Sequence, residues 1–390
     1  DEFQARLYSA RMDFAPQLSA TGNLPVARLG GVTFPGFPSP FAHYVQGALS
    51  WEMDIWGRIR RANEASMAEL LARDENRRAI TLQIVGGVAQ SYFDLRQFDM
   101  QLEIAKRTLA AWEESVRIGQ ARLRQGLINK LDVDQFEAER ENAAARIAEL
   151  KRHMIQKENE ISVLLGRNPS QIARGRSLTE QIMPPVVPAG LPSELLQRRP
   201  DVVAAEQQLV AATARIGVAK AERFPKLSLT GILGVASPTL TDFVSPSTSF
   251  GVLAPVLTGP LLNAQTLGFQ QQAVEAQAKQ AVAQYEQTVL VAFREVEDAL
   301  VGVSTAREQA AAQERQVNSL RSALHLANLR YKGGLANYLD VLIAQRSLFV
   351  TELALADTHR LHLVSVVQLY KALGGGWSPE KNQPKDSSKG

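Results

Sequence analysis

The residues that could do chemistry in this chain are few and poorly placed for it. His359 and His362 lie three positions apart, so one turn of a helix could bring their imidazoles together. A zinc site needs four protein ligands, or three protein ligands and a water. The sequence shows no third ligand for this pair. Gly86 and Gly87 are not followed by the Gly-Lys-Ser/Thr of a phosphate-binding loop. We interpret the histidines as polar surface residues and the two glycines as a close-packing point or bend within a helix.

Composition excludes several other classes of function. The chain has no Cys, so it holds no disulfide, thiolate metal site or Cys nucleophile. No Ser-His-Asp set, catalytic carboxylate pair or nucleotide-binding motif is recognisable, and we therefore expect no enzyme, no cofactor and no metal. Lys and Arg number 43 against 40 Asp and Glu, with the signs mixed along the chain, so nucleic acid is not an expected partner. We interpret the basic run at 58–61 as solvated or facing lipid headgroups.

The elements that must position any site come from an internal repeat. Residues 122–133 match residues 330–341 at an offset of 208, and Pro16–Gly22 matches Pro225–Gly231 at an offset of 209. The chain therefore reads as a duplication, with a first repeat at 1–190, a second at 191–377 and a disordered tail at 378–390. Only 15 residues precede the first Pro-x-Leu-Ser run. We therefore expect that the first repeat lacks its opening helices and that the chain is part of a longer protein.

Each repeat has the same order of expected elements. Long runs without proline, at 41–168 and 261–378, permit helices of unusual length. Apolar residues at alternating steps of three and four, from Leu339 to Tyr370 for example, predict antiparallel coiled-coil hairpins. The expected elements are strands at about 14–27 and 41–54, a long helix at about 55–125 and a return helix at about 129–166. In the second repeat they are a helix at about 200–223, strands at about 224–236 and 248–258, a long helix at about 261–332 and a return helix at about 337–374.

The four expected strands are almost free of charge. Arg28 is the only Lys, Arg, Asp or Glu between Phe14 and Trp51, and Asp242 is the only one between Leu227 and Val274. Low charge with period-two alternation favours an outer-membrane β-barrel over a soluble sheet that caps the coiled coils, although both remain open on pattern alone. Four strands cannot close a barrel, and lipid does not tolerate an open sheet edge. The barrel must then be shared between chains.

Two short turns connect the long helices to their return helices. One reads Gly126-Leu127-Ile128-Asn129, and the other reads Gly334-Leu335-Ala336-Asn337. Asn129 and Asn337 are predicted N-caps of the return helices. Asp132 and Asp340 then fall at the third helical position, where a carboxylate suits the helix dipole.

Three motifs resemble those of a known family. The runs at 51–58, 191–201 and 216–225 are similar to the TolC-like outer-membrane efflux proteins, and most of all to the OprM/NodT-type lipoprotein subgroup that serves resistance-nodulation-division pumps. The resemblance covers residues 1–377. It implies a fold that is mainly α with a membrane β-barrel portion, in which a homotrimer forms a 12-stranded barrel and an α-helical tunnel. It also implies the bacterial outer membrane with a large periplasmic part, and a lipid anchor on an N-terminal Cys that this chain lacks.

The resemblance further implies function, partners and site residues. The function is an exit duct that carries drugs or other toxic compounds away from a periplasmic adaptor and an inner-membrane transporter. The family's periplasmic gate corresponds to Asp132, Asp340 and Tyr331, and its adaptor-contacting tips correspond to Gly126, Leu127, Gly334 and Leu335. The family often has a basic residue five positions after that Tyr, where this chain has Ala336. For the two aspartates, a gate role and a helix-capping role are compatible.

Two other functions stay open at this point. The same fold could serve as the exit duct of a type I protein-secretion system. From a different class, the chain could be a soluble periplasmic coiled-coil scaffold such as an adaptor, although adaptors usually carry one hairpin rather than a duplicated unit.

Overall fold

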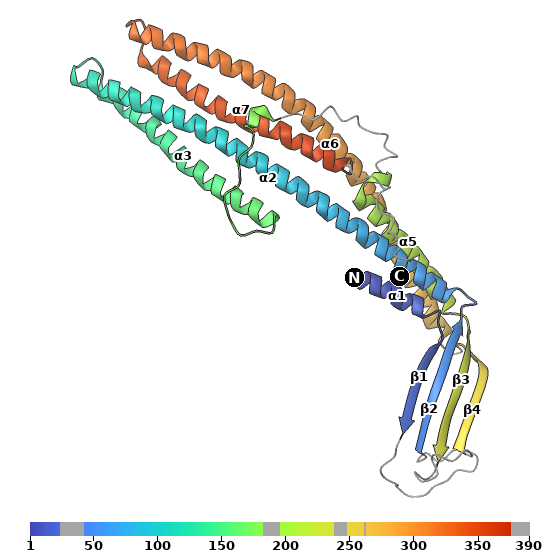
Figure 1. Ribbon diagram of the computed structural model, residues 1–390. Helices are drawn as coiled ribbons and strands as arrows, with labels where there is room; N and C mark the ends of the chain where they lie inside the picture. The colour runs from blue at the N-terminus through green and yellow to red at the C-terminus, as the bar shows by residue number, and fades with distance from the viewer. Residues whose placement is uncertain (24–42, 182–195, 238–247, 261–262, 376–390) are drawn as a thin grey trace, which may run out of the picture. The chain divides into compact units, whose positions relative to one another are not determined.

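Long helices and one small antiparallel sheet make up the described chain. The computed structural model describes residues 1–23, 43–181, 196–237, 248–260 and 263–375 (Figure 1). Its elements are α1 (Glu2–Met12), β1 (Gln17–Asn23), β2 (His43–Met53), α2 (Arg58–Arg124), α3 (Lys130–Leu164), η1 (Leu178–Glu180), α5 (Pro200–Ala221), β3 (Lys226–Ser237), β4 (Ser249–Thr258), α6 (Ala264–Lys332) and α7 (Tyr338–Ala372). The prediction of a mainly helical fold is confirmed. The ends of the predicted strands at 24–27 and 41–42, the start of the motif at 191–201 and the tail at 378–390 lie outside the described residues.

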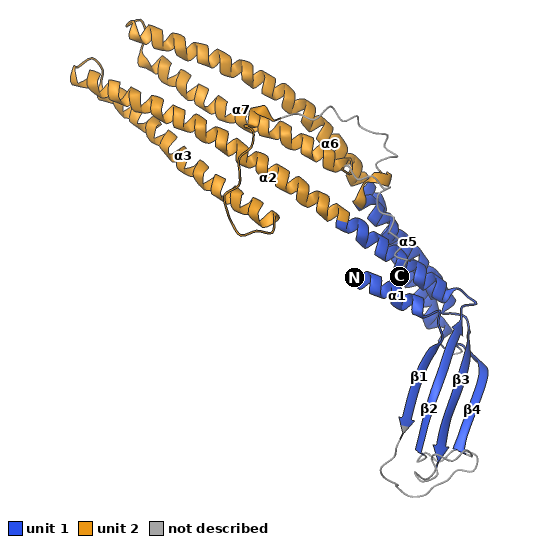
Figure 2. Ribbon diagram, in the orientation of Figure 1, with its two compact units in different colours: residues 1–77, 201–289 blue, residues 78–200, 290–390 orange. Residues whose placement is uncertain are grey.

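The chain forms two compact units, each drawn from both halves of the sequence (Figure 2). Unit 1 comprises Asp1–Arg77 and Asp201–Val289, and therefore contains the sheet, α1 and α5. Unit 2 comprises Arg78–Pro200 and Leu290–Gly390, and contains the two hairpins α2–α3 and α6–α7 with their turns. The helices α2 and α6 are long enough to contribute to both units.

A short turn with a defined backbone geometry separates the end of β2 from the start of α2. Gly57 has φ +80°, a left-handed conformation that favours glycine. The Asp54 carboxylate then accepts the backbone N–H groups of Ile59 and Arg60, both at 2.9 Å, and so satisfies two donors of the first helical turn. Without proline to interrupt it, α2 continues for 67 residues, about 100 Å at about 1.5 Å per residue.

The sheet of unit 1 is antiparallel in the order β1-β2-β3-β4. Its register pairs Leu18 with Leu49 and Gly47 with Leu233. Gly234 is needed where two backbones approach closely, because a Cβ there would lie 2.6 Å from the carbonyl oxygen of Val45. Strands β1 and β4 are the edges, each paired on one side within the described chain. Apolar side chains are exposed along the sheet, including Leu18, Leu233, Val252, Leu253 and Leu257.

The core of unit 2 follows part of the predicted apolar seam. Phe349 and Ala356 of α7 are buried with Leu150 of α3. Leu339 and Tyr370, predicted members of the same seam, are instead 50% and 41% exposed. A straight α-helix has 3.6 residues per turn, so a strict 3.5-residue stripe drifts by about 20° per heptad away from its partner. The ends of the long α7 stripe therefore rotate towards solvent.

In the part of the chain that the structure describes, none of the helices has a stretch long and apolar enough to cross a membrane.

Candidate functional site

The two helix–helix turns of unit 2 have the same backbone geometry. Gly126 and Gly334 adopt φ +72° and +73°. The next residue of each turn donates its N–H back into the preceding helix, Leu127 to the Arg122 carbonyl at 3.0 Å and Leu335 to the Arg330 carbonyl at 2.8 Å. This is a Schellman cap, in which a left-handed residue ends the helix while satisfying its last carbonyl groups. The chemistry that reverses the chain is therefore local to each Gly-Leu pair.

Both turns present a leucine to the outside. The side chains of Leu127 and Leu335 are 67% and 75% exposed. A Cβ added at Gly126 or Gly334 would meet nothing within 4 Å, so the glycines are required by their backbone angle and not by crowding. Each turn thus offers an exposed apolar side chain on a backbone turn closed by hydrogen bonds.

The return helices begin at the two predicted asparagines, in different ways. Asn129 precedes α3 and its side-chain oxygen accepts the Asp132 N–H at 2.9 Å, while the Asp132 carboxylate accepts the Asn129 N–H at 3.3 Å. This reciprocal pair is a capping box. Asn337 precedes α7 and accepts the N–H of Tyr338 at 3.0 Å. The Asp340 N–H reaches only the backbone carbonyl of Asn337, at 3.4 Å.

The two aspartates are consequently not equivalent. Asp132 is partly buried and holds the capping box, whereas Asp340 is exposed. Two basic residues near the turns have other partners: Lys130 pairs with Asp134 at 2.9 Å, and the Arg122 guanidinium lies over the Tyr331 ring. Among the described residues the Asp340 carboxylate has no ion pair.

An aromatic cluster joins the two turns. Tyr331 meets Tyr338 edge to face at 4.8 Å between ring centroids, and Tyr338 meets Phe136 at 4.1 Å. Arg122 lies 4.7 Å from the centre of the Tyr331 ring. The basic group beside Tyr331 therefore comes from the end of α2, and not from the position that Ala336 occupies. Burial raises the pKa of the Tyr338 hydroxyl.

Sequence reasoning did not single out Phe136 and Tyr338. Phe136 is 1% exposed and packs with Trp112, Val116 and Val341. Gly119 of α2 makes this possible, because a Cβ there would lie 2.7 Å from the Phe136 ring. The available signal in the sequence was the valine that follows each aspartate, Val133 and Val341. Both valines are buried, so they mark the inward face of each return helix.

Two of the other residues that the sequence singles out, His359 and Arg58, have carboxylate partners in the structure. Nε2 of His359 lies 3.7 Å from Glu314, and burial lowers the pKa of both His359 and His362. No group of three metal-ligating side chains occurs among the described residues. In the basic run, Arg58 binds the Glu52 carboxylate with two hydrogen bonds of 2.8 and 2.9 Å.

Arg199 lies in the run at 191–201 that resembles the efflux family, and the structure shows its contacts. Its side chain is buried and donates to the Ala372 carbonyl at 3.1 Å and to the Glu295 carboxylate at 2.8 Å. It thereby ties the end of α7 to α6 within unit 2. Gly374 follows with φ +86°, and a Cβ there would lie 2.8 Å from the Arg198 carbonyl oxygen. Only glycine fits this close approach without displacement.

The comparisons with known proteins agree on one family. The model of the family described as outer membrane efflux protein matches residues 1–167 and 191–375. The chain is 36% identical over 334 residues to the solvent efflux pump outer membrane protein SrpC of Pseudomonas putida, which covers 85% of this chain and 71% of that protein. It is 35% identical over 329 residues to the cation efflux system protein CusC of Escherichia coli O6:H1, covering 84% and 71%.

Solved structures give the same answer. A crystal structure of CusC superposes with a TM-score of 0.88 at 32% identity, covering 96% of this chain and 87% of that chain. The outer-membrane channel OprN superposes with a TM-score of 0.86 at 28% identity, covering 96% and 86%. These names favour efflux over type I secretion and over a soluble scaffold. The chain belongs to the outer membrane efflux protein family and forms the outer-membrane exit duct of an efflux pump.

Proposed function

We propose that three copies of this chain assemble the duct, with their sheets closing one 12-stranded barrel and their helices forming one tunnel. The observation that carries this is the sheet of unit 1. Its edges β1 and β4 each have a partner on one side only in the described chain, and β4 exposes apolar side chains at consecutive positions, Val252 and Leu253. Consecutive strand residues point to opposite faces, so this edge strand is apolar on both. An open apolar edge is unstable in water and in lipid, and pairing β1 of one copy with β4 of the next removes it.

The turns of unit 2 are proposed as the periplasmic end of this duct. The exposed Leu127 and Leu335, each on a Schellman turn, would contact the periplasmic adaptor, and Gly126 and Gly334 would hold them in place. Asp132, Asp340 and Tyr331 would line or latch the closed aperture, and Arg122 joins them through its contact with Tyr331.

The cargo and the anchor belong to the same proposal. The relatives are named for the efflux of solvents, toluene, antibiotics and cations, and we propose that this duct likewise passes drugs or other toxic compounds handed to it by an inner-membrane transporter. The resemblance to the family supports a lipid anchor at the N-terminal side. The internal match supports an origin of the chain as two repeats, at 1–190 and 191–377.

Crosslinking of the sheet edges tests the assembly. The chain has no Cys, so an introduced pair reports without background. Ala20 lies on β1 and Ala254 on β4, with two strands between them. They are therefore three strand spacings apart, about 14 Å within one sheet and too far for a disulfide. Ala20→Cys would be combined with Cys at each position from 250 to 257 in turn, in outer-membrane vesicles, and oxidised.

The expected result is a ladder of bands on a non-reducing gel that ends at three chains. It should appear for the position on β4 that lies opposite Ala20 of the neighbouring copy. The single variants are the matched controls and should give no ladder. A monomer band under all pairings, or recovery of the chain in the soluble fraction, would contradict the shared barrel.

A further inference from the structure

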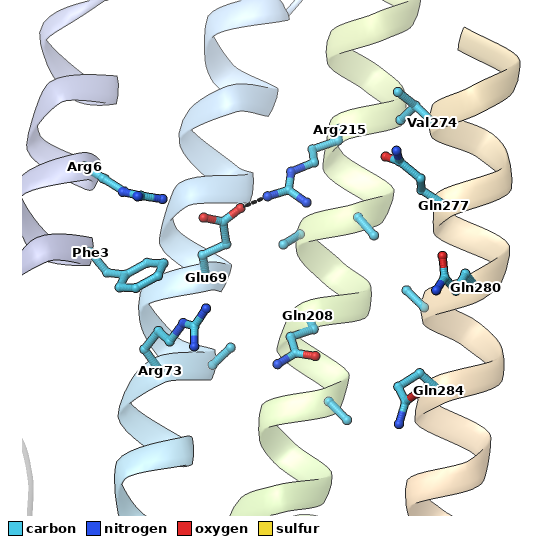
Figure 3. Close-up of a pocket in the computed structure, with 15 residues that line it drawn as sticks. Phe3, Arg6, Glu69, Arg73, Gln208, Arg215, Val274, Gln277, Gln280 and Gln284 are labelled. Atoms are coloured by element: carbon cyan, nitrogen blue, oxygen red, sulfur yellow. Dashed lines mark hydrogen bonds and ion pairs between the residues drawn. The ribbon is translucent and has the colours of Figure 1, made fainter. Parts of the chain in front are cut away.

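A polar cavity in unit 1 has no role in the proposed function. It has a volume of about 580 Å³ and is lined by side chains of α1, α2, α5 and α6. Figure 3 shows these side chains converging from the four helices. Short alanine side chains, including the buried Ala72 and Ala211, form part of the lining and leave room for a ligand.

The charges that line the cavity are mostly positive. Three guanidinium groups, those of Arg6, Arg73 and Arg215, face one carboxylate, that of Glu69. Arg215 hydrogen-bonds to Glu69, as Figure 3 shows. Arg6 pairs with Glu2 at 2.5 Å in an exposed pair, which is a weak interaction in water. The lining therefore has more cationic groups than its own carboxylate can neutralise.

Arg73 is the group with unused binding capacity. Its guanidinium lies 4.5 Å from the centre of the Phe3 ring, and Arg6 lies 5.1 Å from the same centre, so the ring sits between two cations (Figure 3). A ring attracts a cation but accepts none of the five N–H donors of an arginine in the usual way. Within the described residues no ion pair joins Arg73 to a carboxylate.

The remaining lining fits an anion with an apolar body. The amides of Gln208, Gln277 and Gln280 can each donate hydrogen bonds to oxygen atoms, while Phe3 and the alanines offer an apolar surface. Arginine binds carboxylate, sulfate and phosphate oxygens in a bidentate manner, which lysine cannot do. We propose that this cavity is a binding site for small organic anions, with Arg73 and Arg215 on the anionic group and Phe3 against the apolar body.

Binding needs no transport, so this inference stands apart from the duct and can fail or succeed independently of it. The test is isothermal titration calorimetry of the purified full chain in a nonionic detergent. The probe is naphthalene-2-sulfonate. Two matched probes share its ring system, 2-naphthylmethanol without charge and 2-naphthylmethylammonium with the opposite charge. Titration into detergent alone gives the background for each.

The expected result is that the sulfonate binds about tenfold more tightly than either matched probe, because Arg73 and Arg215 are exposed and two exposed ion pairs of about threefold each act together. Arg73 is exposed, so Arg73→Gln should weaken sulfonate binding by about threefold. Arg73→Lys should weaken it by less, since charge remains but the bidentate fork is lost. Raising NaCl from 50 to 500 mM should weaken binding to the native chain.

A variant that is expected to raise the affinity for the sulfonate distinguishes loss of the site from misfolding. Glu69→Gln removes the carboxylate that occupies Arg215 and should tighten sulfonate binding by about threefold. The exposed Arg152 of α3 lies outside the cavity, and Arg152→Gln should leave binding unchanged. Equal binding of the three probes, or unchanged affinity in Arg73→Gln, would overturn the proposal.

Discussion

The two turns of unit 2 share a backbone and differ in their side chains. Both end a long helix with a glycine near φ +72° and an N–H bond from the following leucine. At the first turn, Asn129 and Asp132 close a capping box, while at the second Asn337 caps alone and Asp340 stays exposed. The comparison teaches that the chain reversal depends on the glycine, whereas the side-chain chemistry can change without altering the reversal. Of the two aspartates, Asp340 is therefore the one whose carboxylate is not engaged in helix capping.

The largest expected effect tests the packing behind the first turn. Phe136→Ala removes a side chain that is 1% exposed, and the matching position of the second return helix is already Ala344. Loss of a buried Phe costs about 3–5 kcal/mol in the free energy of unfolding. The measurement is the urea midpoint of the helical circular dichroism signal. Phe269→Ala, at a 60% exposed position, is the control and should change the midpoint little.

The next effect tests whether the turns are equivalent in backbone. Gly126→Ala and Gly334→Ala each force a residue with a Cβ into the left-handed region, at a cost of about 1–2 kcal/mol. The two losses should agree within error, as judged by the same urea midpoint. Gly268→Ala lies within α6, at an ordinary φ with no neighbour within 4 Å, and should be neutral or stabilising. Unequal losses at the two turns would show that packing, and not the backbone angle, fixes one of them.

A smaller effect separates the two aspartates. Asp132→Asn weakens the capping box and should cost about 0.5–1 kcal/mol, whereas Asp340→Asn should cost a few tenths at most. If Asp340 lines the aperture, Asp340→Asn should lower the cation selectivity of single channels in planar bilayers. Unchanged selectivity in the Asp132→Asn, Asp340→Asn double variant would leave both residues as helix-capping groups.

The smallest effect is a pH dependence specific to the second turn. Burial raises the pKa of Tyr338 above its ordinary value near 10. The unfolded chain then ionises this group first, so its contribution to stability is fully present below about pH 10 and is lost as pH rises through the folded pKa. Between pH 8 and 11 the native chain should lose more stability than Tyr338→Phe. Tyr8→Phe, at an exposed tyrosine, should behave like the native chain.

The sequence by itself determined the long helices, the turns and the family. Absence of proline permits a helix, and a Gly or Asn acts on hydrogen bonds within a few residues of itself, so Gly126, Gly334, Asn129 and Asn337 could be read from local chemistry alone. Family motifs are likewise visible as runs of residues. The prediction was weaker for the seam of α7, because a small drift in helical phase over many turns moved Leu339 out of it.

Only the tertiary structure decided which distant side chains meet. Arg122 and Tyr331 are more than 200 residues apart, as are Phe136 and Tyr338, and their contacts depend on the rotation of four helices about their own axes. The same holds for Arg199 against the end of α7 and for the cavity around Arg73. Local patterns fix which residues are helical but not the phase at which helices face each other, because that phase is set by packing over the whole length of the pair.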